Sequence, residues 1–267
     1  MNRTRLGKLE VIHRSPEGAA QATPLLFVHG AYTGAWCWDE YFLSWFAEQG
    51  YHAYAVSLSG HGKSRGGAYL DSFSIADYVN DVAEVVASLP VAPVLIGHSM
   101  GGMVVQKYLE RHGAPGAVLM ASVPPQGLLG SAFGLAFSRP NLLGDLNRLM
   151  GGGQPHMETL RQALFHEVIE MERLQRYYHL CQPESHRAIW DMSLFDLPSL
   201  SRMKVPPMLV LGAEHDVLIP PDQVRMTARR YDTEALILPG LGHGMMMESQ
   251  WRRAADPIRA WLKLEGL

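Results

Sequence analysis

Cysteine is scarce in this chain of 267 residues: Cys37 and Cys181 are the only two. Two thiols so far apart in the sequence form neither a disulfide framework nor the paired-cysteine pattern of a zinc site. No other cluster of ligand-type residues suggests a metal. We therefore expect no disulfide-stabilised scaffold, no bound metal and no other cofactor.

The chain also lacks a strong charge of one sign and long apolar runs. Its formal net charge of −3 gives no basic surface of the kind that binds nucleic acid. It has no window of about 18 apolar residues, which a membrane-spanning helix requires. The first residues, MNRTRLGKLEVIHRS, lack the apolar segment of a secretory signal. We expect a cytoplasmic protein without stable membrane insertion, a monomer or homodimer, acting on a small molecule.

The apolar content is high enough for one globular core, since 47% of the residues are hydrophobic. Short apolar runs recur, each ending in a glycine or a polar turn, and they predict strands buried on both faces of a parallel sheet. These runs cover residues 24–30, 52–58, 93–99, 116–122, 207–214 and 234–240. Helical patterns accompany them at residues 39–49, 74–89, 100–112, 224–231 and 251–264. The alternation predicts the α/β class, a mostly parallel sheet with helices on both faces.

The alternation of strands and helices stops between residues 123 and 198. This part has helical stretches, such as residues 156–180, but no clear strand. It leaves the sheet after a strand run, and open α/β sheets bind ligands at the carboxyl ends of their strands. We predict that residues 123–198 form a helical cap over a core built from residues 1–122 and 199–267. A few additional helices packed on a sheet face are the alternative.

A lone serine between glycines stands where a strand run gives way to a helical run. Gly97-His98-Ser99-Met100-Gly101 fits the pattern G-x-S-x-G. In that pattern a sharp strand-to-helix turn holds the serine in strained backbone geometry with its hydroxyl exposed. A serine that only caps a helix is the alternative. The strand on one side and the helix on the other favour a nucleophile at Ser99.

A serine nucleophile needs a base, and the base needs an acid that orients it. In this strand–turn–helix arrangement the acid follows the serine in the chain and the histidine comes last. Asp216 and His243 each come just after a predicted strand. Glu214 and His215 compete with Asp216, but the apolar residues 217–220 that follow Asp216 favour it as the acid. They are expected to pack and fix its position.

The negative charge that develops on the substrate also needs hydrogen-bond donors. One is predicted to be the backbone N–H of Met100, the residue after the nucleophile, and the other an N–H from the loop after the first parallel strand. In that loop Gly30 permits an unusual turn, and Ala31 is our predicted donor; an ordinary turn after a strand is the alternative. Among the other histidines, His98 lies next to the serine and is expected to pack or hydrogen-bond, and His29 and His61 lie in turns and are expected to be structural.

Five segments occur in a fixed order: FVHGAYTGAWCW, SLSGHGKS, LIGHSMGG, LGAEHDVLIP and GLGHGMMME. Together they resemble the α/β-hydrolase superfamily, most closely its esterase and lipase-like members with a compact helical lid. The resemblance extends from about Leu25 to the end of the chain. It implies an eight-stranded, mostly parallel sheet and a catalytic triad of Ser99, His243 and Asp216. It also implies oxyanion donors at Ala31 and Met100.

The loop HGAYTGAWCW is similar to that of plant methyl esterases and hydroxynitrile lyases. The lyases carry a lysine directly after the histidine and a threonine near the oxyanion loop, whereas here Gly244 follows His243 and Ala31 follows Gly30. These differences disfavour cyanohydrin cleavage. Dehalogenases of this fold carry an aspartate in place of Ser99, so halide displacement is disfavoured too. The haloperoxidase-like members share the triad, which leaves a perhydrolase side activity open.

The motifs and the resemblance predict a carboxylesterase-like serine hydrolase (EC 3.1.1) that forms an acyl-enzyme on Ser99. Its substrates are expected to be small to medium lipophilic esters. The residues predicted to line the substrate pocket, each of which could instead pack in the core, are Tyr32, Trp36, Leu128, Phe133, Phe137 and Met245. Two alternatives remain: a cofactor-independent lyase or oxygenase that uses His243 as a general base, and a ligand receptor on the same fold.

Overall fold

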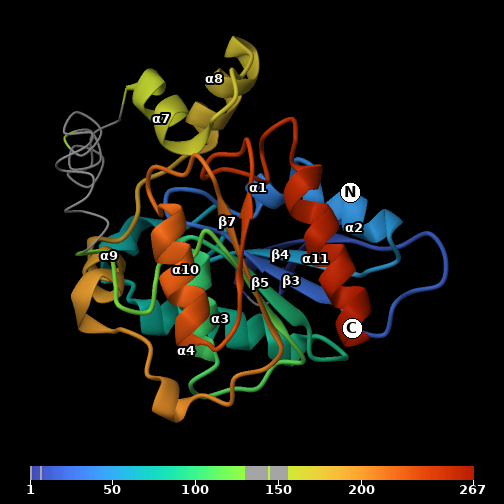
Figure 1. Ribbon diagram of the computed structural model, residues 1–267. Coiled ribbons are helices and arrows are strands. Elements are labelled where there is room, and N and C mark those ends of the chain that lie inside the picture. Colours follow the sequence, from blue (N-terminus) through green and yellow to red (C-terminus); the bar gives the residue numbers. More distant parts are fainter. Residues whose placement is uncertain (1, 7, 130–143, 145–155) are drawn as a thin grey trace.

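An eight-stranded sheet forms the centre of the molecule (Figure 1). The computed structural model describes residues 2–6, 8–129, 144 and 156–267. The strand order is β1-β2-β4-β3-β5-β6-β7-β8; β1 and β2 pair antiparallel, as do β2 and β4, and all later pairs are parallel. The strands are β1 (Asn2–Leu6), β2 (Leu9–Arg14), β3 (Leu25–Val28), β4 (Ala53–Ser57), β5 (Val94–His98), β6 (Ala117–Met120), β7 (Met208–Ala213) and β8 (Ala235–Leu238). The predicted fold class is confirmed.

The six apolar runs predicted as strands are β3 to β8. The runs did not predict β1 and β2, because their sequences, NRTRL and LEVIHR, mix apolar with charged residues. These two strands form the antiparallel edge of the sheet, where a strand does not need to be apolar on both faces.

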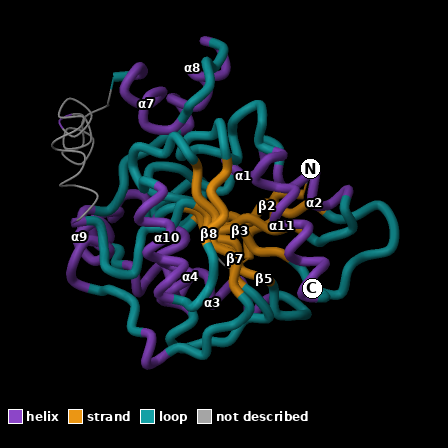
Figure 2. The backbone as a smooth tube through the Cα atoms, in the orientation of Figure 1, coloured by secondary structure: helices purple, strands orange, loops and turns teal. Residues whose placement is uncertain are grey.

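Helices cover both faces of the sheet. Alternate residues of a strand point to opposite sides, and in the central strands both sets are apolar and need to be covered. In β3, Leu25 and Phe27 belong to one buried cluster, and Leu26 and Val28 belong to the other. The first cluster also contains residues of α1 (Trp36–Asp39), α2 (Phe42–Glu48) and α11 (Arg252–Glu265). The second contains residues of α3 (Ile75–Ser88), α4 (Met100–Tyr108) and α10 (Pro221–Arg230). Figure 2 shows α2 and α11 on one side of the strands and α3, α4 and α10 on the other.

Helix α3 illustrates how local sequence sets these elements. The Ser74 hydroxyl accepts a hydrogen bond from the Asp77 N–H, and the Asp77 carboxylate accepts one from the Ser74 N–H, which is a capping box. The apolar positions that follow are buried at helical spacing: Ile75, Tyr78, Val79, Val82 and Val85. The helix therefore begins at a defined residue and packs one face against the core.

Between β6 and β7, the described residues form helices and no strand: α7 (Met157–Leu164), α8 (Met171–Leu180) and α9 (His186–Trp190). A π turn at Asp191–Phe195 and a 3₁₀ turn at Leu200–Arg202 follow them, and another 3₁₀ turn, at Gly67–Ser72, precedes α3. The predicted helical stretch 156–180 is thus two helices, which lie together beyond the loops that leave the sheet (Figure 1). Gly244 donates a backbone hydrogen bond of 2.6 Å to Leu164, so the end of α7 contacts the loop after β8. The division into core and cap stays a prediction.

Across the described part of the chain, none of the helices combines the length and the apolar character that crossing a membrane requires.

Candidate active site

Ser99 occupies the single residue between β5 and α4. Its backbone angles are φ 53° and ψ −118°, a conformation that side-chain-bearing residues adopt only when the surroundings enforce it. Hydrogen bonds on both sides enforce it here: the Ser99 N–H donates to Met120, and the Ser99 carbonyl accepts from Val123, each at 3.0 Å. Ser99 is half-buried while His98 and Met100 are buried, so the turn presents the serine to solvent.

Two of the glycines in the motif are required by close backbone approach. A Cβ on Gly97 would overlap the backbone of Gly101, and a Cβ on Gly101 would overlap the carbonyl of Val28. The start of α4 therefore lies directly against β3 and β5, which a larger residue would prevent.

The acid and the base predicted from the sequence lie together. Asp216 Oδ2 and His243 Nδ1 are 2.7 Å apart, and both side chains are buried. Asp216 Oδ1 accepts backbone hydrogen bonds of 2.8 Å from Leu218 and Ile219. The segment after Asp216 thus fixes the carboxylate, as predicted, but through its N–H groups. With Nδ1 donating to Asp216, the Nε2 lone pair of His243 is left to accept a proton.

His98 links the base to the serine turn. Its Nε2 donates a 2.9 Å hydrogen bond to the His243 carbonyl, and the two rings are 4.6 Å apart. Burial, together with the neighbouring His243, lowers the pKa of His98 well below 6.5, so the ring is neutral. This is the hydrogen-bonding role expected for His98, and it brings the loop of His243 to the residue before Ser99.

The two residues that compete with Asp216 in the sequence, Glu214 and His215, make other contacts. Glu214 and His215 are exposed and form a 3.4 Å contact with each other. The His215 ring stacks at 3.6 Å on His166, which lies just after α7. Neither of the two makes a hydrogen bond to His243 within the described residues, where the carboxylate paired with His243 is Asp216.

The loop after β3 lies against Ser99, since a Cβ placed on Gly30 would be 3.0 Å from that of Ser99. The Gly30 carbonyl accepts hydrogen bonds from His29 Nδ1 at 2.8 Å and from Thr33 Oγ1 at 2.9 Å. A peptide group is planar and trans, so fixing this carbonyl also fixes the Ala31 N–H in the opposite direction. His29 and Thr33 therefore orient the predicted oxyanion donor. The sequence offered no signal for Thr33.

His29 is held in one tautomer. Its Nε2 accepts a 3.0 Å hydrogen bond from the Leu58 N–H, so its proton lies on Nδ1, which donates to Gly30. Burial and the neighbouring His61 lower the pKa of His29 to about 3, which keeps the ring neutral. The second predicted donor, the Met100 N–H, is at the first position of α4, where helical N–H groups have no intrahelical acceptor.

Most of the chain matches a known protein family. The model of the alpha/beta hydrolase family matches residues 25–256. The chain belongs to the α/β-hydrolase family.

Known relatives of this α/β hydrolase differ in their reported activities. A non-heme haloperoxidase from Rhodococcus erythropolis is 37% identical over 106 residues, which are 38% of this chain and 38% of that protein. A monoacylglycerol lipase from Mycolicibacterium smegmatis is 23% identical over 227 residues, 81% of this chain and 80% of that protein. Among solved structures, an esterase from Exiguobacterium antarcticum superimposes with a TM-score of 0.75 at 18% identity, covering 96% of this chain and 95% of that one.

The predicted pocket residues of the α/β hydrolase lie in different surroundings. Tyr32 is half-buried with φ 66°, and half-buried Trp36 stacks at 5.8 Å on Tyr177 of α8. Leu128 is half-buried against the cluster around α3 and α4, whereas Met245 is fully buried in the cluster around α1, α2 and α11. Phe133 and Phe137 lie outside the described residues. The pocket lining stays a prediction.

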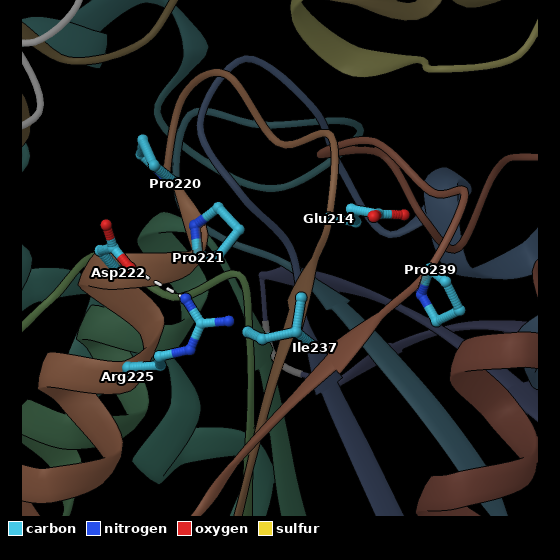
Figure 3. A pocket seen from close by; sticks show the side chains of 7 residues that line it. All are labelled: Glu214, Pro220, Pro221, Asp222, Arg225, Ile237 and Pro239. Carbon is cyan, nitrogen blue, oxygen red and sulfur yellow. Dashed lines mark hydrogen bonds and ion pairs between the residues drawn. The ribbon is translucent and has the colours of Figure 1, made fainter.

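An open cavity of about 390 Å³ lies beside β8 and α10 (Figure 3). Its lining includes Glu214, Arg225 and three prolines, and it contains none of the predicted triad or pocket residues. Arg225 points toward Asp222 on the same helix, at 2.8 Å. In the described part of the chain, no group of three or more His, Cys, Asp or Glu side chains is arranged to hold a metal ion.

Proposed function

We propose that this α/β hydrolase is a carboxylesterase that cleaves small to medium lipophilic esters through an acyl-enzyme on Ser99. The observation that carries the proposal is the buried pair of Asp216 and His243, joined through His98 to the strained turn at Ser99. Esterase and lipase relatives support this class. The predicted nucleophile, acid and base follow three different strands of the sheet, β5, β7 and β8, in the chain order typical of this architecture.

The reaction proceeds in two steps. His243 Nε2 takes the proton of the Ser99 hydroxyl as Ser99 Oγ bonds to the ester carbonyl carbon. The N–H groups of Ala31 and Met100 stabilise the oxyanion; a donor of this kind is worth about 3 kcal/mol. The carbon–oxygen bond to the alcohol then breaks, and the alcohol leaves with the proton from His243. Water attacks the acyl group, gives its proton to His243, and releases the acid as Ser99 regains its proton.

Residues 123–198 are proposed to cap this site. The end of α7 contacts the loop of His243, and Tyr177 of α8 stacks on Trp36, which follows the oxyanion loop. A cap in this position would exclude water and contribute apolar surface for the acyl or alcohol group. The proposed partner is a small-molecule ester, with no membrane or nucleic acid involved, and the proposed reaction needs no cofactor.

The test combines covalent labelling with turnover. A fluorophosphonate should label Ser99, as located by peptide mass mapping, and Ser99→Ala should lose both the label and nearly all hydrolysis of p-nitrophenyl butyrate. Ser201→Ala, a change at an exposed serine, serves as the matched control and should behave as the wild type. Label at another residue would contradict the proposal.

The same variant separates the alternatives. A lyase or oxygenase that uses His243 as a general base would keep much of its turnover in Ser99→Ala. A ligand receptor would bind without multiple turnover. The similarity to a haloperoxidase makes perhydrolysis worth assaying, by following peracid formation from an ester and hydrogen peroxide.

A further inference from the structure

The short segment 182–184, between α8 and α9, bridges two loops beside the active site. The Gln182 N–H donates to the Tyr32 carbonyl at 3.0 Å. The Gln182 side chain donates through Nε2 to the Gly60 carbonyl and accepts through Oε1 from the Gly62 N–H, both at 2.8 Å. One residue between two cap helices therefore connects the loop after β3 with the loop after β4.

Two residues further on, Glu184 makes a fully buried ion pair with His61. Glu184 Oε2 is 2.9 Å from His61 Nε2, and neither side chain is exposed. Glu184 Oε1 accepts from the Tyr78 hydroxyl at 2.6 Å and from the Ser185 N–H at 2.8 Å. His61 Nδ1 faces the Ser59 carbonyl at 3.1 Å, so both ring nitrogens meet acceptors. This pair fixes the segment that carries Gln182.

Burial would lower the pKa of His61, but the charge and hydrogen bond of Glu184 outweigh it, and the pKa is raised. Burial would raise the pKa of Glu184, but the charge of His61 lowers it. Both shifts favour the charged forms, and the acceptors facing both ring nitrogens fit a protonated His61. A buried pair of this kind contributes little stability over an apolar core, while removing one partner leaves the other charge unpaired. Here the pair holds residues 182–184 against the loop after β4 and against α3.

The carbonyl that Gln182 holds belongs to a strained residue. Tyr32 has φ 66°, which a large side chain adopts only where its surroundings enforce it. Tyr32 directly follows Ala31, the proposed oxyanion donor. His29 and Thr33 hold the Gly30 carbonyl on one side of Ala31, and Gln182 holds the Tyr32 carbonyl on the other.

We propose that Gln182 and Glu184 are positioning residues for the oxyanion hole. Glu184 fixes residues 182–184 through its pair with His61, and Gln182 in turn holds the Tyr32 carbonyl. The inference rests on the proposed esterase function. It makes residues 182–184 part of the catalytic geometry as well as a packing contact between cap and core.

The experiment compares Glu184→Gln, Glu184→Ala and Gln182→Ala, with kcat for p-nitrophenyl butyrate expressed per site titrated by fluorophosphonate. Glutamine keeps the acceptor for Tyr78 and Ser185, and its amide donates to a neutral His61, so kcat should stay within about threefold. Alanine at 184 releases the segment, and kcat should fall about 10- to 100-fold with KM within about twofold. The loss of an oxyanion donor costs about 10²- to 10³-fold, and displacement costs less. Gln182→Ala keeps the backbone N–H that donates to the Tyr32 carbonyl but loses the side-chain bonds to Gly60 and Gly62 that position it. Its kcat should fall in the same direction, by less than in Glu184→Ala.

The matched control is Asp71→Ala, which removes an exposed contact of Asp71 with His186, the first residue of α9 and two residues beyond the segment. Exposed pairs contribute little, so its kcat should be unchanged. Wild-type kcat in both alanine variants, or an effect on KM alone, would overturn the inference. If Glu184→Ala does not fold, by circular dichroism, Gln182→Ala decides. If the fluorophosphonate does not label Ser99 in the wild type, the esterase function itself is refuted. If it labels Glu184→Ala at the wild-type rate, only the positioning role is refuted.

Discussion

Replacing Asp216 with asparagine tests the assignment of the acid most sharply. The two backbone N–H groups at 2.8 Å from Oδ1 can face only an acceptor, so the asparagine carbonyl takes that position. Its NH₂ group then faces His243 Nδ1, which must accept, and the ring proton moves to Nε2. His243 keeps its place but loses the lone pair that accepts the proton of Ser99.

A base held in the wrong tautomer costs about 10⁴-fold in kcat, or about 5.5 kcal/mol of barrier. Stability should change little, because the number of hydrogen bonds is preserved. The assay is kcat/KM for p-nitrophenyl butyrate between pH 6 and 10, with melting temperature as the folding check. Glu214→Gln, a neutralisation of the exposed neighbouring carboxylate, is the control and should stay within about twofold. Asp216→Asn with a loss below about tenfold, or Glu214→Gln with a large loss, would refute the assignment.

Three other perturbations test contacts around the site. His98→Phe removes the hydrogen bond on the His243 carbonyl, and kcat per titrated site should fall about 10- to 100-fold, since a small displacement of a reacting group has effects of this size. Gly97→Ala should lose at least about 2 kcal/mol in urea unfolding, because its Cβ meets the Gly101 backbone. The His61 pKa is raised, so the charged pair with Glu184 stabilises the fold below about pH 6.5 and loses that effect as the pH rises through the raised pKa. The melting temperature of the wild type should therefore decline relative to Glu184→Gln above about pH 6.5, and a constant difference would contradict this reasoning.

The sequence predicted the parts of the molecule that depend on local pattern. The buried parallel strands appear as apolar runs, and the turn at Ser99 appears as glycines between a strand and a helix. Asp216 and His243 could be predicted because each follows a strand, and parallel strands bring their carboxyl ends to one edge. The polar strand β2 escaped the pattern because it pairs antiparallel and is only half-buried at its end.

The contacts that complete the site could not be read from local pattern. Glu184 and His61 are 123 residues apart, and nothing in the short-range sequence of either indicates the other. Gln182 bonds to Gly60, which lies 122 residues earlier in the chain, and to Tyr32, which lies earlier still. Such partners are set by how the helices between β6 and β7 pack against the loops of the sheet, which sequence periodicity does not specify.

The charge states of the three buried histidines near the site, His29, His61 and His98, leave no unneutralised positive charge beside His243. His61 lies between two acceptors and is charged, but Glu184 neutralises it. His29 accepts an N–H from Leu58 and stays neutral, and burial keeps His98 neutral. This matters for His243, which becomes positively charged in the proposed mechanism. A charged His98 ring 4.6 Å away would oppose this by about 3–4 kcal/mol at an effective dielectric constant of about 20, more than two orders of magnitude in rate. Keeping His98 neutral therefore lets it hold the loop of His243 without opposing the charge that the proposed mechanism places there.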